Sequence, residues 1–403
     1  FQLADQNNKS LRLHDLAIDE AEQAIKVAYN DRLPSIQAQV ELKYIGDGVM
    51  TDRDFSNAVH ADMPHFGNTF AIKASQVIYA GGAITRNIRQ SKLNKQETEW
   101  IHADSKQDIR FLLTGYYLDL FQLNNQKRVY ENNIEQTRLL VKDMRAAYKQ
   151  GTALKSDITR YELQLQNLEL SLTSVKDSLD VLNHELATAI GLEPYVTIIP
   201  DTAELFKVNI EKGTEATWQE KISSTPAIQL SQVKIEQAKN KFELIKAERR
   251  PKVSLIAAND FTGPILVEVP PMNNNFTNWY AGIGISYNID ALFKTKKKLK
   301  QAQISTWKME QARKVAEEEA ENAIHKAYVN LNEAYIRLRT QKKSVQLAHE
   351  NFNIVRQRYV NGLALVTDML DASNSKLNAE LQLVNAQINI CLLYTSDAAD
   401  DMQ

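Results

Sequence analysis

The sequence contains little cysteine, proline or glycine. Its 403 residues include one cysteine, Cys391, with nine prolines and thirteen glycines. A single cysteine excludes an internal disulfide framework. Few prolines and glycines favour long uninterrupted elements, because these residues are the main breakers of regular structure. The formal net charge is −2, and a balanced charge gives no indication of nucleic-acid binding.

Long apolar runs and catalytic motifs are also missing. No run of about 18 apolar residues occurs, so no helix is expected to span a membrane. The most apolar helical stretch, 111–121, is short and contains Asp119. The seven histidines show no metal-ligand spacing, and no Ser-His-Asp order, phosphate loop or CxxC motif is found. We therefore expect a protein that is not an enzyme and has no metal or cofactor.

An internal repeat is present instead. The segment YVNGLALVTDML begins at Tyr359, and a similar one, YKQGTALKSDIT, begins at Tyr148, an offset of 211 residues. At that offset several residues are shared without a gap: Gly151 with Gly362, Ala153 with Ala364, Leu154 with Leu365 and Asp157 with Asp368. This predicts two similar halves, each with a helix, two strands, a very long helix, a glycine break and a second long helix.

Four segments show the period-two alternation of a strand with one apolar and one polar face. They lie at about 34–45, 68–80, 251–261 and 278–289. Each has the length of about ten residues that a tilted strand needs to cross a bilayer, with aromatic residues near its ends. Tyr44, Phe261 and Trp279 are expected at one membrane interface, and Tyr79 and Tyr287 at the other. Two hairpins of a soluble sheet explain the alternation alone equally well.

The number of strands bears on this choice. Four strands cannot close a barrel, for which about eight are the usual minimum, and an open sheet edge is not tolerated in lipid. If these strands span a membrane, several chains must therefore each donate four. Long helices are predicted at 83–149, 155–190, 291–360 and 366–393, with an alanine-rich seam of coiled-coil spacing. A soluble coiled-coil scaffold is the alternative architecture.

This order of elements resembles the TolC family of outer-membrane efflux proteins over residues 3–393. The most specific matches are the two helix breaks, AYKQGTALKSDITRYELQLQ and QRYVNGLALVTDMLDASNSKLNAELQLVNAQIN. The resemblance implies a mainly α fold with a membrane β-barrel portion: a trimer with a 12-stranded barrel and a periplasmic helical barrel. It implies repeats at 1–190 and 226–393, an equatorial segment at 191–225, and a tail at 394–403 outside the family pattern.

The resemblance also implies partners. Such a channel passes cargo from an inner-membrane pump, of RND or ABC type, through a periplasmic adaptor (membrane fusion protein) in efflux or type I secretion. It is a homotrimer in contact with outer-membrane lipid and binds no nucleic acid. The adaptor docks at the tip turns, here Tyr148, Gly151, Ala153, Leu154, Tyr359, Gly362, Ala364 and Leu365. Well-known members carry an arginine at the position of Ala364, so a closing link through that arginine cannot exist here.

Three acids follow the helix breaks: Asp157, Asp368 and Asp371. Symmetry in a trimer turns each into a ring of acids, which makes them candidates for a cation-attracting periplasmic gate. Asp157 and Asp368 are equally suited to capping the helix that follows, because carboxylates stabilise a helix N-terminus. The sequence therefore leaves both a gate and a helix cap open for Asp157 and Asp368.

Two charged segments could be taken for binding sites, but simpler explanations are favoured for both. His60 and His65 lie between the first two strands, near Asp47, Asp52 and other acids, where a solvated extracellular loop is favoured over a metal site. The run KTKKKLK, 294–300, opens a helix just after a strand. A solvated or lipid-headgroup-facing collar is favoured there over a nucleic-acid patch.

The two ends of the sequence are unusual. Residue 1 is phenylalanine, and neither a charged segment nor an apolar leader precedes the first helix. We therefore expect a processed chain or a fragment. The last ten residues, YTSDAADDMQ, break the helical pattern, and we expect this tail to be an artefact of the sequence.

Overall fold

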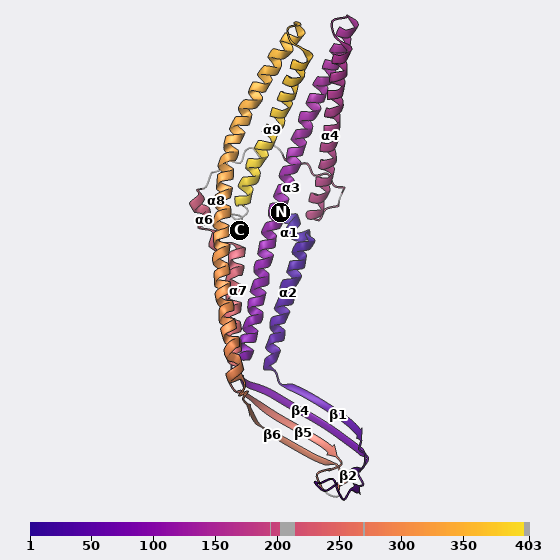
Figure 1. Cartoon of the computed structure of the whole chain (residues 1–403), viewed down its shortest axis with the longest axis vertical. Helices are drawn as coiled ribbons and strands as arrows, with labels where there is room; N and C mark the ends of the chain where they lie inside the picture. The colour runs from indigo at the N-terminus through magenta and orange to yellow at the C-terminus, as the bar shows by residue number, and fades with distance from the viewer. Residues whose placement is uncertain (194, 202–213, 269–270, 399–403) are drawn as a thin grey trace. The chain divides into compact units, whose positions relative to one another are not determined.

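A computed structural model describes residues 1–193, 195–201, 214–268 and 271–398, with side chains given to 393 (Figure 1). The chain forms two compact units, each assembled from both halves of the sequence. Unit 1 contains Phe1–Leu16, Trp100–Gln229 and Lys314–Gln403, and unit 2 contains Ala17–Glu99 and Leu230–Arg313. The compact units therefore cut across the two sequence repeats, because corresponding elements of the two halves pack together.

Unit 2 contains a four-stranded antiparallel sheet. Its strands are β1 (Ser35–Tyr44), β4 (Phe66–Ala80), β5 (Lys252–Gly263) and β6 (Phe276–Ser286), in the order β1-β4-β5-β6. All four lie where the alternation predicted strands. The central pair, β4 and β5, joins the two halves of the sequence.

The long connection between β1 and β4 contains a small hairpin that the sequence interpretation missed. Strands β2 (Gly48–Met50) and β3 (Val59–Ala61) form a separate two-stranded sheet. Three residues are too few to display a period of two, so no pattern identified them. The predicted count of four strands is therefore wrong, because the structure has these two short strands in addition.

Four helices of unit 2 form a layer joined to the sheet. They are α2 (Lys9–Tyr29) and α7 (Pro226–Ala247), with the beginnings of α3 (Ala83–Lys149) and α8 (Ala291–Val360). Ion pairs join neighbours in the order α2, α3, α7, α8: Lys95–Glu22 at 3.6 Å, Arg86–Glu243 at 3.8 Å and Lys239–Glu310 at 3.3 Å. The short helix η1 (Asn30–Arg32) ends before Pro34, which cannot continue a helix.

Unit 1 contains two helical hairpins. The rest of α3 is followed by α4 (Lys155–Ala189), and the rest of α8 is followed by α9 (Val366–Ala398). The short helices α1 (Gln2–Asn7), α6 (Glu215–Gln219) and η2 (Ile222–Ser224) complete the unit. Leu113, Leu120 and Leu186 pack with Ala4 in one buried cluster, and Leu118, Phe121 and Ile388 form another. These contacts tie α1, α3, α4 and α9 together.

Helices α3 and α8 have the predicted bounds, α4 ends one residue earlier than predicted, and α9 ends later. That helix continues to Ala398, past the expected end at 393 and into the predicted tail. Of the expected equatorial segment 191–225, residues 194 and 202–213 lie outside the described residues. Within the described part of the chain, no helix has both the length and the apolarity needed to cross a membrane.

Candidate functional site

The two hairpin tips have the same backbone geometry. Gly151 has a φ of 77° and Gly362 a φ of 72°, a left-handed conformation that glycine adopts without steric cost. In each turn the glycine N–H donates to the carbonyl of the tyrosine three residues earlier, Tyr148 or Tyr359, at 2.9 Å. An added Cβ would meet nothing within 4 Å at either glycine. The backbone angle, and not the surrounding space, therefore requires glycine at both positions.

Two of the three candidate acids cap the helices that follow the turns. Asp157 Oδ2 accepts the backbone N–H of Leu154 at 3.2 Å, and Asp368 Oδ2 accepts that of Leu365 at 3.0 Å. These bonds satisfy backbone donors that would otherwise have no partner at a helix start. Asp371, one turn further along α9, is exposed. The capping interpretation therefore describes what Asp157 and Asp368 do in this chain.

A buried cluster beneath the tips holds the two hairpins together. It draws on all four helices: Val141 and Met144 (α3), Ile158 and Tyr161 (α4), Phe352 (α8), and Val366, Met369 and Ala372 (α9). Burial raises the pKa of Tyr161, with a smaller contribution from Tyr359. Burial also raises the pKa of Tyr359, together with the nearby charge of Asp157. Tyr359 packs against the buried cluster and lines the same groove as Asp157.

A groove separates the two turns at the tips. Its lining includes Ala153 and Leu154 from one hairpin and Ala364 and Leu365 from the other, with Asp157 beside them. Leu154, Leu363 and Leu365 are mostly exposed. The tips therefore present exposed apolar side chains at the turns, and the methyl group of Ala364 offers no hydrogen bond across the groove.

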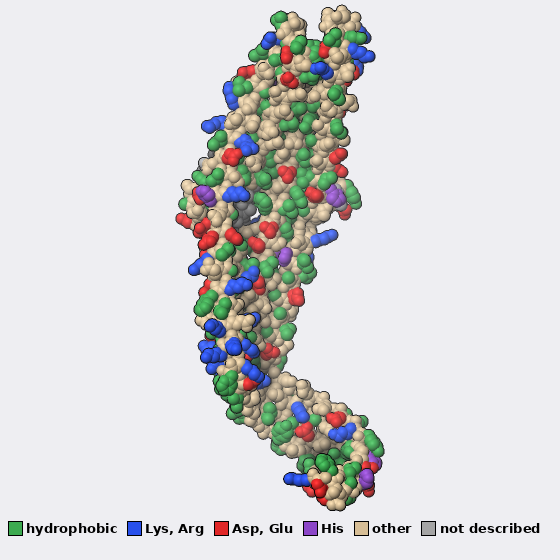
Figure 2. Space-filling model, in the orientation of Figure 1, with side chains coloured by type: hydrophobic (Ala, Val, Ile, Leu, Met, Phe, Trp, Pro, Cys, Tyr) green, Lys and Arg blue, Asp and Glu red, His purple; other side chains and the backbone are tan. Residues whose placement is uncertain are grey.

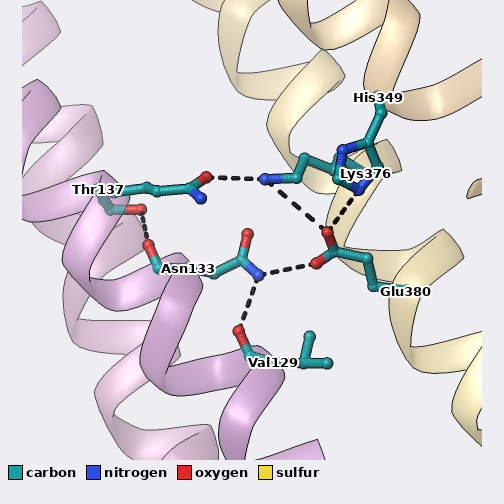
Figure 3. Close-up of polar contacts among 7 residues, drawn as sticks. Val129, Asn133, Thr137, His349, Lys376 and Glu380 are labelled. Carbon is teal, nitrogen blue, oxygen red and sulfur yellow. Dashed lines mark hydrogen bonds and ion pairs between the residues drawn. The ribbon is translucent and has the colours of Figure 1, made fainter. Parts of the chain in front are cut away.

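A polar network not anticipated from the sequence joins α3 to the α8–α9 hairpin (Figure 3). Lys376 is 5% exposed and donates to Gln136 Oε1 at 2.8 Å. Glu380 lies 3.8 Å from Lys376 Nζ, and it accepts Asn133 Nδ2 at 3.0 Å and contacts His349 Nε2 at 2.7 Å. The ammonium of Lys376 also lies 5.0 Å from the centre of the Phe352 ring. A buried charge is thus paired on one side and covered by an aromatic face on the other.

In the sheet, the strand register gathers most of the apolar residues of the four strands on one face. Leu42 and Val40 of β1 share this face with Phe70 of β4, Leu255 of β5 and Ile283 of β6. Most of these side chains are exposed. The opposite face carries polar residues, including Gln37, Gln39, Lys73, Asp260 and Asn278. An exposed apolar face of this extent is uncommon on a monomeric soluble protein and indicates an interaction surface.

The proposed interface aromatics lie along a diagonal of this face. Tyr44 is opposite Phe66 on β4, Phe261 is level with Phe70, and Trp279 is level with Ile72. The aromatic position therefore advances by about two residues per strand, as tilted strands require if all three side chains lie at one depth. Tyr79 lies at the other end of β4, opposite Val253, and Tyr287 follows the end of β6.

The sheet has two open edges. β1 and β6 each pair on one side only, so their outer backbone groups have no strand partner among the described residues. An open edge beside an exposed apolar face requires a further strand or other cover. Around the β1–β4 connection, His65 stacks on Tyr44 at 5.1 Å and contacts the Ile45 carbonyl at 2.9 Å. These contacts account for His65 without a metal.

Comparison with known proteins gives a family match over part of the chain. Residues 218–390 match the model of the outer membrane efflux protein family, OEP. This segment, less than half of the chain, matches an outer membrane efflux protein domain. The resemblance expected from the sequence is thereby confirmed. The efflux-protein domain contains strands β5 and β6, the whole of α8 and the second tip turn with Gly362 and Asp368.

Solved structures extend the likeness to the whole fold. VceC, an outer membrane protein of Vibrio cholerae, is 15% identical with a TM-score of 0.79, and the match covers 99% of this chain and 94% of that one. The CmeC outer membrane channel of Campylobacter jejuni is 14% identical with a TM-score of 0.79, covering 99% and 84%. The open-state MtrE outer membrane channel of Neisseria gonorrhoeae is 16% identical with a TM-score of 0.77, covering 99% and 87%. At these identities the likeness concerns the fold. Comparison with curated protein sequences gave no match.

Proposed function

We propose that the chain is the outer-membrane exit duct of a tripartite efflux or type I secretion system. The observation that carries the proposal is the sheet in unit 2, with its exposed apolar face, its polar opposite face and its two open edges. This arrangement suits lipid on one side and a water-filled channel on the other. The efflux-protein domain at residues 218–390 supports an outer-membrane location and a transport role without catalysis.

A duct of this kind requires several copies of the chain. In lipid, every backbone hydrogen-bonding group must be satisfied, so the edges of β1 and β6 must pair with other chains. Three copies would give a closed barrel of 12 strands. The long helices would then surround a continuous tunnel in the periplasm.

The hairpin tips are the proposed contact with the adaptor, which leads to the inner-membrane pump. Turns with exposed leucines, such as Leu154 and Leu365, offer an apolar docking surface. The gate is proposed at the same end, formed by rings of Asp368, Asp371 and Asp157. Capping uses one oxygen of Asp157 and one of Asp368, so each side chain keeps a second oxygen available for a cation.

Reconstitution into planar lipid bilayers tests the proposal. We expect discrete conductance steps with a preference for cations, and we expect Asp368→Ala with Asp371→Ala to weaken that preference. Purified protein that gives no conductance, or conductance unchanged in the double variant, would contradict the duct or the gate, respectively. Heat-modified gel mobility and dependence on detergent separate the duct from a soluble coiled-coil scaffold, which has neither property.

A further inference from the structure

Five lysines open helix α8 directly after the sheet. Strand β6 ends at Ser286 and α8 begins at Ala291, and the lysines follow at once: Lys294, Lys296, Lys297, Lys298 and Lys300. All five are exposed, and we refer to them as the lysine collar. Figure 2 shows Lys and Arg side chains gathered at the end of α8 that joins the sheet. The collar is therefore a surface feature at the boundary between strands and helices.

Only part of the collar is neutralised within the chain. Lys294 pairs with Asp290, and Lys298 pairs with Glu248 at 3.3 Å. No described carboxylate lies within ion-pair distance of Lys296, Lys297 or Lys300. Arg249 and Arg250, in the connection from α7 to β5, add further positive charge. Three lysines thus remain available to an anion from outside.

Helix α8 begins differently from the helices that follow the tip turns. Helices α4 and α9 have Asp157 and Asp368 in their first turns, whereas the first turn of α8 has no acid, and Asp290 directly before it pairs with Lys294. Lys296, Lys297 and Lys300 lie beyond the first turn, where the helix dipole has little effect. The helix dipole therefore gives no reason for lysines at these three positions.

The acidic residues of α8 lie further along the helix than the collar. After the collar, acidic residues appear at Glu310 and then at Glu317, Glu318, Glu319 and Glu321. At 1.5 Å per residue, Lys300 and Glu310 are about 15 Å apart along the axis, beyond the screening length of about 8 Å at physiological salt. The collar therefore keeps a local positive field although the net charge of the chain is −2.

The residues just before the collar are apolar and exposed. Ile285 is 72% exposed, Ile289 is 65% exposed, and Phe293, in the first turn of α8, is 76% exposed. The chain thus passes from the apolar sheet face, through exposed apolar residues, to lysines within a few residues. Lysine side chains lay their alkyl stems along apolar surface and extend the ammonium into a polar layer. This order of residues matches the boundary between hydrocarbon and headgroups.

We propose that the lysine collar binds the anionic headgroups of phospholipids in the leaflet next to the helix end of the sheet. Lys296, Lys297 and Lys300 are the binding residues, because they have no carboxylate partner in the described chain. The proposal rests on the proposed function, since it needs the sheet face in a bilayer. Clusters of four to eight basic residues beside a membrane element are a general mode of anionic lipid recognition.

The test measures the lipid that the full-length protein retains. Protein is incubated in neutral detergent with an equimolar mixture of phosphatidylglycerol and phosphatidylcholine, purified again, and its bound lipids are quantified by mass spectrometry. We expect the wild type to retain at least about five times more phosphatidylglycerol, since one basic residue near an anionic surface contributes about that factor. The variant K296Q/K297Q/K300Q is expected to lose this preference, and high salt should weaken it in the wild type.

A matched control lies on the same helix. The variant K326Q/K342Q/K343Q removes three exposed lysines from the part of α8 that belongs to unit 1 and is expected to retain the wild-type preference. Circular dichroism should show that K296Q/K297Q/K300Q is folded and about as stable as the wild type, because glutamine and lysine have similar helix propensities.

The outcomes separate the two proposals. Equal retention of both lipids by the wild type, or an unchanged preference in K296Q/K297Q/K300Q, overturns the lysine collar and leaves the duct standing. Retention of neither lipid overturns the membrane location and the collar together. If a labelled single-stranded oligonucleotide displaces phosphatidylglycerol from the wild type but does not bind the triple variant, the lysines serve nucleic acid, and the lipid proposal is wrong.

Discussion

The carboxylate of Asp368 accepts the backbone N–H of Leu365 at 3.0 Å, at the start of the helix that follows the second tip turn. The same relationship joins Asp157 to Leu154 in the first hairpin. The bond gives Asp368 a structural role whether or not its charge also acts in a gate. Variants that separate the hydrogen bond from the charge can therefore assign each role.

Asp368→Ala removes both the bond and the charge, and we expect it to destabilise the protein by about 1 kcal/mol, the usual cost of a lost helix cap. Asp368→Asn keeps an acceptor oxygen and should recover much of this loss. Asp371→Ala removes an exposed acid and should change stability little. Thermal unfolding measures these changes in stability, and ion selectivity in bilayers measures what each charge contributes to the gate. If the loss of selectivity across the variants followed their loss of stability and not their loss of charge, the gate would be contradicted.

The two tip glycines should respond alike to alanine. Gly151→Ala and Gly362→Ala each place a side chain at a φ above 70°, which costs about 1–2 kcal/mol for a residue with a Cβ. No clash adds to this cost, because the space around both positions is open. Gly115→Ala is the control, since Gly115 lies within α3 and has similarly open space. There alanine should stabilise by about 1 kcal/mol. Melting temperatures that move in the same direction for all three variants would contradict this explanation.

The elements that the sequence predicted are those with a local signal. Alternation marks a strand such as β1 without reference to any other segment, and the repeated turns show where the long helices end. The register then placed most of the apolar residues of the four strands on one face, as the alternation of each strand required. Strands β2 and β3 were missed because three residues carry no period.

The polar network was missed for a different reason. Asn133 and Lys376 belong to residue types expected on the outer faces of these helices, yet both are buried. Their burial depends on which side of α3 meets α9, a long-range fact that no spacing within one helix encodes. The sequence likewise showed that Asp157 and Asp368 suited either a cap or a gate, and only the backbone geometry identified the cap.

The N-terminal segment should give the protein an acid-sensitive contact. Asp5 lies 3.2 Å from both Lys106 and Arg110 of α3. Burial alone would raise the pKa of Asp5, but the bonds to these two cations lower it below its ordinary value of 3.8. The unfolded chain therefore binds more protons than the folded one in this range. The contact stabilises the protein fully above about pH 4, and this contribution is lost as the pH falls through the folded-state value.

Asp5→Asn tests this pH dependence. The variant should be less stable than the wild type at pH 7, and the difference should shrink as the pH falls below about 4, because both chains then lack the charge. Asp19→Asn, at an exposed aspartate of α2, is the control and should show no such convergence. Melting curves between pH 3 and 7 measure both. A constant difference between Asp5→Asn and the wild type would show that the ionised carboxylate contributes nothing to stability.

The network around Lys376 should behave as a coupled unit. Glu380→Gln leaves a buried ammonium without its carboxylate, and breaking a buried pair in this way costs about 3 kcal/mol or more. Lys376→Met keeps the volume and removes the charge. It should cost less, since Glu380 retains Asn133 and His349 as partners.

The double variant decides whether the pair acts as a unit. In the Lys376→Met variant no buried cation remains, so adding Glu380→Gln should destabilise the protein much less than Glu380→Gln does in the wild type. We expect the two changes together to be less destabilising than the sum of the single changes by at least about 1 kcal/mol, a coupling typical of residues in one network. Chemical or thermal unfolding of the four proteins measures this coupling. Strictly additive effects would mean that Gln136 and the Phe352 ring, and not Glu380, stabilise the buried ammonium.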